Sequence, residues 1–373
     1  MRPSLSGTRR LVIKIGTNVL AGGPGGFRPE TAEEIVRCSA ALQQRGLEVI
    51  LVSSGAIGLG AHRLGRSGRI TPIADRQVCA AVGQPLLMNE YHRLFQQHGV
   101  PIAQVLLTRE LLNDRDSFLN IQATVHNLLR QGIIPICNEN DSVSTAEIGP
   151  VFGDNDNLSA HIASKLDADL LVLLTDIDSL YTADPRNTPD ARPISLVERI
   201  TPELLQAATG SSSELGTGGM RTKLEAVQIA ARAGTNVIIA DGRAPGTLLQ
   251  IIDDEPVGTL FLSGTRMKSR QRWIANAAPR GTIHIDAGAE QALLTGKSLL
   301  PKGILSVDGS FRAGEIIRLN TAFNAVSRLD SNQIRRIMGR HSSEIPGILG
   351  RATGDVVAQA EDIVVLIEQD GQQ

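Results

Sequence analysis

Two lysines in distant segments have the side chains best suited to hold a phosphoryl group. Lys14 interrupts an otherwise apolar run at 10–16 (RLVIKIG), and Lys223 ends the glycine-rich stretch at 214–223 (ELGTGGMRTK). Lys223 and Arg221 fall in the first turn of a predicted helix, where the helix dipole favours anions by about 0.3–1 kcal/mol per charge. Two cations at the start of a helix are therefore unusual, and a bound anion, contacted by both cations and by the glycine amides, would account for them. The alternatives are an edge-strand lysine that prevents aggregation and a flexible surface loop.

A second polar group stands in VFGDNDNLSA at 151–160, where Asp154, Asn155, Asp156 and Asn157 follow one another. Asp and Asn favour turns and cap helices, so local structure is one explanation. Carboxylates and amides gathered at the end of a loop can also bind a ligand. This segment alone leaves both interpretations open.

Polar residues follow almost every predicted strand of the first 262 residues. In an open α/β sheet, ligands bind outside the carboxyl ends of the strands. The polar strand ends lie at 14–17, 53–55, 138–141, 175–176 and 241–242. Their number predicts a binding site at this edge of the sheet.

Short apolar runs alternate with helical patterns as far as residue 262, which predicts an α/β fold with a mainly parallel sheet and helices on both faces. The predicted strands are at 10–16, 47–55, 102–108, 133–140, 169–176 and 236–242. The predicted helices are at 29–44, 85–97, 118–130, 158–166 and 222–233. We therefore assign residues 1–262 to one α/β domain.

The pattern changes after residue 262. Residues 263–282 are basic, polar and patternless, and we interpret them as a linker. Short strands with close glycine turns follow, at 281–288, 303–309, 311–320 and 362–368. They predict a small β-rich domain at 283–361.

The composition is that of a soluble globular protein large enough for two domains. The chain has 373 residues, of which 42% are hydrophobic and 20% charged, and its net charge is −2. This balance gives no support to binding of nucleic acid or membranes through charge. Three dispersed cysteines and histidines without paired spacing predict no metal site on the protein. The apolar stretch after Arg9 and Arg10 is too short for a signal peptide, so we expect a cytoplasmic protein.

Two ammonium groups, glycine loops and several carboxylates fit phosphoryl transfer, a reaction that needs positioning and charge neutralisation more than covalent help. A carboxylate between the two lysines would fix their positions. If the acceptor is itself a carboxylate, it is ionised at pH 7 and needs no general base. An α-amino group on the acceptor would give Asp141 and Asp154 a role as ammonium partners.

Six stretches, in the same order, resemble the motifs of the amino-acid kinase family, and within it those of the members that phosphorylate glutamate. They are VIKIGTNVL (12–20), VSSGAIGLG (52–60), NENDSVSTAEI (138–148), FGDNDNLSA (152–160), LLTDIDSLYTADPR (173–186) and GTGGMRTK (216–223). The resemblance extends over nearly the whole chain, because SLLPKGI (298–304) and GEIIRL (314–319) are similar to the PUA domain that many such kinases carry.

The resemblance implies a three-layer αβα sandwich around a mainly parallel sheet, followed by a small β-rich PUA domain. It implies ATP-dependent phosphorylation of the L-glutamate side-chain carboxylate to γ-glutamyl 5-phosphate, the first step of proline biosynthesis. It further implies Mg as a cofactor, proline as a feedback inhibitor, a homo-oligomer (dimer or tetramer) and functional coupling to glutamate-5-semialdehyde dehydrogenase.

The resemblance also implies roles for individual residues. Lys14 and Lys223 match the phosphate-binding lysines, and Asp156 matches the aspartate that organises them. The positions expected to bind glutamate are Ser54, Asp141 and Asn155, assisted by Asp154. The nucleotide site would consist of Lys14, Thr175, Asp176, Thr217, Gly218, Gly219, Met220, Arg221, Thr222 and Lys223. Arg221 occupies a variable place in its motif, so its role stays open, and the glycine loop at 22–27 matches no motif.

Two other functions are compatible with parts of the sequence. A kinase of N-acetylglutamate would use similar lysines, but its acylated substrate has little use for acidic partners and such enzymes lack a PUA domain. An RNA-binding protein is suggested by the PUA resemblance alone. Residues 283–361 hold nine Lys/Arg and eight Asp/Glu, a net charge of +1, and only Phe311 and Phe323 as aromatics. This is a poor surface for stacking bases, so we expect no RNA binding.

Overall fold

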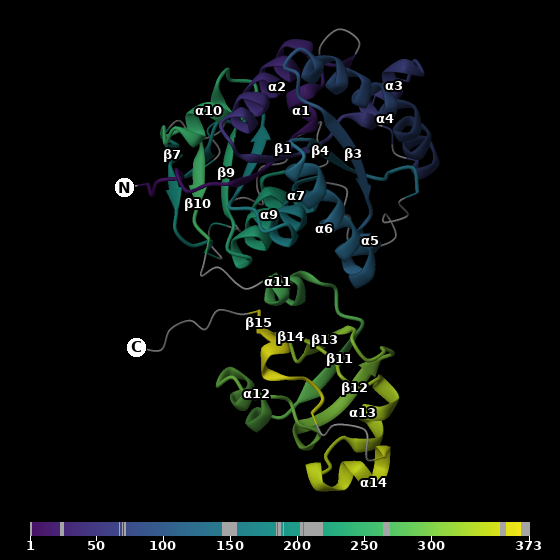
Figure 1. Cartoon of the computed structure of the whole chain (residues 1–373). Coiled ribbons are helices and arrows are strands. Elements are labelled where there is room, and N and C mark those ends of the chain that lie inside the picture. The colour runs from purple at the N-terminus through teal and green to yellow at the C-terminus, as the bar shows by residue number, and fades with distance from the viewer. Residues whose placement is uncertain are drawn as a thin grey trace. The chain divides into compact units, whose positions relative to one another are not determined.

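The computed structural model describes residues 2–22, 26–66, 68, 70, 72–143, 155–183, 185, 188, 190–201, 204, 219–263, 269–350 and 356–366. The chain forms two compact units, residues 1–266 and 267–373 (Figure 1). Each unit has its own sheet and its own hydrophobic core. No helix in these described ranges is long and apolar enough to cross a membrane.

The first unit is built on an eight-stranded sheet of order β3-β4-β2-β1-β5-β9-β10-β8. All neighbouring strands are parallel except β9 and β10, which are antiparallel. The strands are β1 (Arg10–Ile15), β2 (Glu48–Ser53), β3 (Ile102–Leu107), β4 (Ile134–Glu139), β5 (Leu170–Thr175), β8 (Leu196–Val197), β9 (Asn236–Asp241) and β10 (Thr259–Phe261). The short strands β6 (Leu180–Tyr181) and β7 (Pro193–Ile194) pair with each other outside this sheet.

Helices cover both faces of the sheet and give the expected three layers. One core joins α2, α4 and α10 to the sheet, and the other joins α6, α7 and α9 to its opposite face (Figure 1). The helices are α1 (Thr17–Leu20), α2 (Pro29–Gln44), α3 (Ala56–Arg63), α4 (Ile73–Gln96), α5 (Arg109–Asn113), α6 (Arg115–Arg130), α7 (Asn155–Lys165), α9 (Met220–Arg232) and α10 (Thr247–Ile252). The α/β fold class predicted from the sequence is confirmed.

Strand β1 lies in the interior of the sheet, between β2 and β5. Successive side chains of a strand point to opposite faces. Leu11 and Ile13 belong to the core beneath α2 and α4, whereas Val12 belongs to the core beneath α7 and α9. Lys14, two residues after Val12, therefore points toward α7 and α9. The interpretation of Lys14 as an edge-strand lysine is wrong.

The predicted strands agree with the structure, but one helix starts much earlier than predicted. The helix assigned to 85–97 is α4, which begins at Ile73 and contains Pro85 in its interior. Pro85 was taken for the first residue of a helix, the position where proline is most often found. Smaller differences at the starts of α6, α7 and α9 amount to two or three residues.

The second unit contains a five-stranded sheet of order β12-β11-β13-β14-β15 with its own apolar core. Its strands are β11 (Gly281–Ile285), β12 (Ile304–Gly309), β13 (Ile316–Leu319), β14 (Phe323–Val326) and β15 (Ile363–Val365). Its helices are α11 (Ser269–Asn276), α12 (Ala287–Leu294), α13 (Ser331–Ile337) and α14 (Ile345–Leu349), with 3-10 turns at Pro301–Gly303, Ser342–Glu344 and Ala360–Asp362. The sequence did not predict β14.

Part of the predicted linker is folded. Helix α11 lies inside the segment 263–282, and its Trp273 and Ile274 are buried. The amide of Asn324 in β14 donates to the main-chain carbonyls of Ile274 (2.9 Å) and Ala277 (3.3 Å). The helix is held by these contacts with the sheet of its own unit, which no local sequence pattern reveals.

Candidate active site

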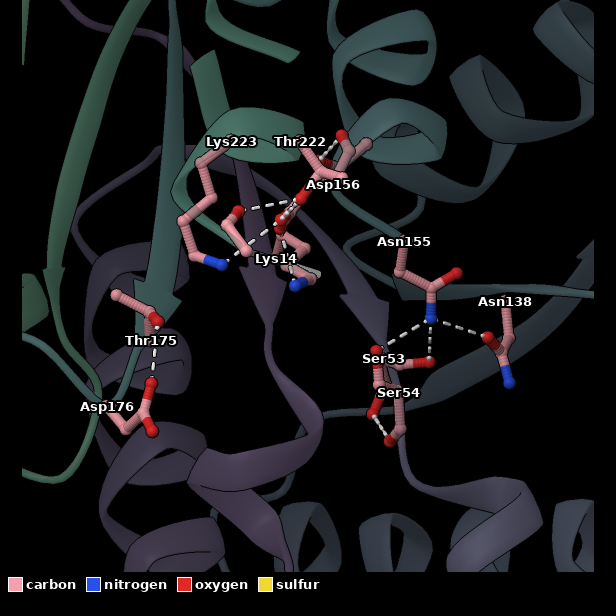
Figure 2. Close-up of polar contacts among 12 residues, drawn as sticks. Lys14, Ser53, Ser54, Asn138, Asn155, Asp156, Thr175, Asp176, Thr222 and Lys223 are labelled. Carbon is pink, nitrogen blue, oxygen red and sulfur yellow. Dashed lines mark hydrogen bonds and ion pairs between the residues drawn. The ribbon is translucent and has the colours of Figure 1, made fainter. Parts of the chain in front are cut away.

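Asp156 lies between two lysines that are far apart in the sequence (Figure 2). One carboxylate oxygen, Oδ1, is 2.5 Å from Lys14 Nζ, and the other, Oδ2, is 3.3 Å from Lys223 Nζ. The Thr222 hydroxyl donates to the same Oδ2 at 3.3 Å and to the Gly219 carbonyl at 2.9 Å. Asp156 is completely buried, and both lysines are almost completely buried.

Three elements bring this cluster together. Lys14 is next to last in β1, Asp156 is the second residue of α7, and Lys223 is in the first turn of α9. Helices α7 and α9 pack side by side on one face of the sheet through Leu158, Leu224 and the residues of their shared core. Their N-terminal ends therefore meet at the carboxyl edge of β1, where the dipoles of both helices favour an anion.

The charges of the cluster favour a bound anion. Two ammonium groups and one carboxylate leave these three side chains with a net charge of +1 in a buried place. Burial of charge is unfavourable unless the charge is paired, so a set with an excess of positive charge favours the binding of a further negative group. A phosphoryl group has the required charge and enough oxygens to contact both lysines.

The amide nitrogen of Asn155 joins a second group of polar residues, beside the first (Figure 2). Nδ2 lies within hydrogen-bond distance of the main-chain carbonyl of Ser53 (3.1 Å), Ser54 Oγ (2.9 Å) and Asn138 Oδ1 (3.0 Å), and these three acceptors share its two hydrogens. Asn155 opens α7, and the three acceptors lie at the carboxyl ends of β2 and β4. Two strand ends and a helix start are thereby tied together next to Asp156.

Asp141 lies just past the end of β4 and is half-buried. Burial raises the pKa of its carboxyl group to about 6, and the positive charge of Arg76 in α4 opposes that rise. A partly buried carboxylate with a raised pKa gains from a cationic ligand, because the ligand replaces the missing water.

The end of β5 carries a third polar group. Thr175 donates to Asp176 Oδ1 (3.1 Å), and Asn18 donates to Asp176 Oδ2 (3.0 Å). Arg243 donates to the main-chain carbonyl of Asp176 at 2.6 Å. Burial disfavours the Asp176 carboxylate, but these hydrogen bonds and the charge of Arg243 outweigh burial, so its pKa lies below the usual value.

Family models match both units of the chain. The amino acid kinase family model matches residues 9–241, and the PUA domain model matches residues 281–349. The chain belongs to the amino acid kinase family. Membership of a kinase family implies that ATP is the phosphoryl donor.

Relatives of this amino acid kinase match along nearly its full length. A glutamate 5-kinase from Proteus mirabilis (strain HI4320) is 45% identical over 368 residues, which cover 97% of this chain and 100% of the relative. A glutamate 5-kinase from Deinococcus radiodurans is 42% identical over 364 residues, which cover 96% of this chain and 100% of the relative. Among solved structures, an isopentenyl phosphate kinase covers 68% of this chain and is itself covered completely, with 16% identity and a TM-score of 0.47.

The structure of this kinase places most of the predicted site residues near one edge of the sheet. Three groups form there, around Asp156, Asn155 and Asp176 (Figure 2). Asp154, Thr217 and Gly218, as well as residues 23–25 of the glycine loop at 22–27, lie outside the described residues. Of the predicted nucleotide-binding residues, Met220 is half-buried, whereas Arg221 is exposed and pairs with Glu225 on its own helix at 3.0 Å.

Sequence reasoning missed several residues of the site. Asn18, Gln84 and Arg243 contact predicted site residues or their partners, yet Gln84 and Arg243 lie in none of the motifs, and Asn18 lies in the motif at 12–20 but was given no role. Asn138 belongs to a polar strand end and opens the motif at 138–148, but sequence reasoning assigned it no individual role. In the described ranges, no group of three or more His, Cys, Asp or Glu side chains could hold a metal ion.

Proposed function

We propose that this chain transfers the γ-phosphoryl group of ATP to the side-chain carboxylate of L-glutamate and releases γ-glutamyl 5-phosphate and ADP. The observation that carries this proposal is the buried Asp156 between Lys14 and Lys223. The similarity to proteins named glutamate 5-kinase over nearly the full length supports the choice of glutamate as acceptor.

The two lysines are the catalytic cations of the proposed reaction. A carboxylate oxygen of glutamate attacks the γ-phosphorus, the bond from that phosphorus to the β,γ-bridging oxygen breaks, and ADP leaves with the electron pair. No proton moves in this step, because the attacking carboxylate is already ionised. Lys14 and Lys223 neutralise charge on the transferring oxygens, and Asp156 holds both ammonium groups in place beforehand.

The amino acid would be held by the groups at the ends of β2 and β4. Ser54, Asn155 and Asp141 supply a hydroxyl, an amide and a carboxylate within this region. A carboxylate partner suits the α-ammonium group of free glutamate and does not suit an acylated nitrogen. We also assign Asp154 to this side of the site, on the basis of its place in the sequence next to Asn155.

The nucleotide would lie over the ends of β5 and α9. Thr175 and Asp176 stand at one side, and residues 219–223 at the start of α9 stand at the other. Mg²⁺ keeps several water ligands and is commonly held by substrate phosphates with one or two carboxylates. We propose that Mg²⁺ enters bound to ATP, where it would neutralise charge on the phosphates.

Four further properties are proposed on the resemblance to the family. Proline has the same pair of charged groups on its α-carbon as glutamate, so it suits the amino-acid side of the site as a feedback inhibitor. The product is a labile acyl phosphate, which favours coupling to glutamate-5-semialdehyde dehydrogenase. We also propose a homo-oligomer, dimer or tetramer, and a cytoplasmic location.

The test is ATP- and Mg-dependent hydroxamate formation with glutamate and with N-acetylglutamate, each with and without proline. Activity on free glutamate is the expected result, and suppression by proline would support the regulatory assignment. Activity on N-acetylglutamate alone would overturn the choice of substrate. Inactivity on both would overturn the proposed reaction.

A further inference from the structure

The hydrogen bonds that run through Asn155, Asn138 and Gln84 have one possible direction. The main-chain carbonyl of Ser53 can only accept, so the Asn155 atom 3.1 Å away must be the amide nitrogen. The main-chain N–H of Glu139 can only donate, so the Asn138 atom 2.9 Å away must be the amide oxygen. Asn138 Nδ2 then donates to Gln84 Oε1 at 2.8 Å, which fixes the third amide as well.

This direction determines what the chain of amides can offer a ligand. Asn155 Oδ1 and Gln84 Nε2 have no partner in the part of the chain that the structure describes, and neither is a buried orphan atom. Asn155 Nδ2, 2.9 Å from Ser54 Oγ, cannot accept a hydrogen bond, so the Ser54 hydroxyl must donate its own hydrogen elsewhere. Figure 2 shows the Asn155 nitrogen directed at its three acceptors and the oxygen pointing away from them. The set therefore presents one acceptor and two donors.

Close contact between two helices holds Gln84 beside the strand ends. A Cβ atom on Gly83 would lie 1.7 Å from the Ala56 carbonyl oxygen, and one on Gly60 would lie 1.8 Å from the Cys79 carbonyl oxygen. Helices α3 and α4 thus touch through their backbones at these glycines. Because α3 starts directly after the polar end of β2, the residue that follows Gly83 is kept next to the site.

We propose that Gln84 is a specificity-determining residue, whose Nε2 donates to the α-carboxylate of the amino-acid substrate while Asn155 Oδ1 accepts from its α-ammonium group. The inference rests on the proposed function, which places the γ-carboxylate at the lysines. The α-carbon of the substrate carries an ammonium group, which donates, and a carboxylate, which accepts. The ammonium group matches the acceptor Asn155 Oδ1, and the carboxylate matches the two donors, Gln84 Nε2 and the Ser54 hydroxyl. Asp141 adds its charge to the ammonium side.

The experiment replaces the hydrogen-bond donor of Gln84, Nε2, by a hydrogen-bond acceptor. Gln84→Glu keeps an acceptor for Asn138 and replaces the amide nitrogen by an oxygen. Steady-state kinetics are measured with glutamate and with isoglutamine, which has an amide in place of the α-carboxylate and keeps the other two charged groups. We expect kcat/KM for glutamate to fall about tenfold to a hundredfold, mainly through KM, because a hydrogen bond to a charged group is lost. The kcat/KM for isoglutamine should stay constant or rise, since the amide of isoglutamine can donate to the new carboxylate.

The matched control is Gln96→Glu, which makes the same chemical change at an exposed position, the last residue of α4. Gln84→Met is the second variant, and it should weaken glutamate use more than isoglutamine use. Both compounds are also measured as competitive inhibitors, so that the affinities of each variant for glutamate and isoglutamine can be compared even if one compound is a slow substrate. Equal losses for both compounds, or no loss for glutamate, would overturn the assignment. A wild-type enzyme that is inactive on glutamate would instead overturn the proposed function.

Discussion

Replacing Asp156 by asparagine tests whether its charge is what organises the site. Coulomb's law with an effective dielectric constant of about 20 gives about 7 kcal/mol for the contact with Lys14 at 2.5 Å and about 5 kcal/mol for that with Lys223 at 3.3 Å. Desolvation of the buried groups offsets much of this attraction. Removal of one partner from a buried ion pair typically lowers stability by about 3–5 kcal/mol. We expect a loss of that size in the free energy of unfolding of Asp156→Asn.

The same substitution should separate nucleotide binding from catalysis. Without the carboxylate, the two buried ammonium groups each lose an ion-pair partner, so the phosphates of ATP should stabilise them more than they do in the wild type. ATP should therefore raise the unfolding temperature of Asp156→Asn more than that of the wild type. Turnover should nevertheless fall by about 10²–10³, because the cations are no longer held where charge develops in the transition state.

The assays are thermal unfolding with and without ATP and steady-state measurement of kcat and of KM for ATP. Asp253→Asn is the control, since Asp253 pairs with Arg45 at the surface (2.8 Å) and such pairs contribute only about 0–1 kcal/mol. The reasoning would be refuted by a variant with wild-type stability and turnover. It would also be refuted by a raised KM for ATP at unchanged kcat, which would make Asp156 a binding residue only.

Three further predictions concern other parts of the first unit. Since burial raises the pKa of Asp141 to about 6, kcat/KM for glutamate should fall as the pH drops through 6, and Asp141→Asn should abolish this dependence and raise KM. Burial lowers the pKa of Lys165 from 10.5 to about 8, so the unfolded chain binds more protons between these values and stability should rise with pH across them. In denaturant unfolding at pH 7, Lys165→Met should be more stable than the wild type by up to about 3 kcal/mol. Gly83→Ala should separate α3 from α4 and lower stability by about 1–3 kcal/mol or more, whereas Gly58→Ala, with open space around its Cβ, should not.

Six of the eight strands in the sheet of the first unit could be predicted from the sequence, and five of these six are buried on both faces, whereas the short strands β8 and β10 were not predicted. Such strands are continuous apolar runs, and their order along the chain alternates with helices. The elements that were missed depend on contacts between distant residues. Helix α11 and strand β14 are short, and the Asn324 amide joins them through carbonyls of the segment 274–277. The start of α4 was missed for a local reason, since Pro85 is more typical of the first turn of a helix than of its interior.

The two lysines of the site were visible in the sequence because each one breaks a local rule. Lys14 stands in an apolar strand, and Lys223 stands at the end of a helix that disfavours cations. Gln84 breaks no rule, because glutamine is an ordinary helix residue. Its place beside the substrate region results from the contact of Gly83 with a helix that begins 27 residues earlier in the chain, at Ala56. The sequence therefore indicates the lysines that supply charge. A neutral residue such as Gln84, whose role depends on the direction of its hydrogen bonds, can be recognised only when the main-chain donors and acceptors around it are located in space.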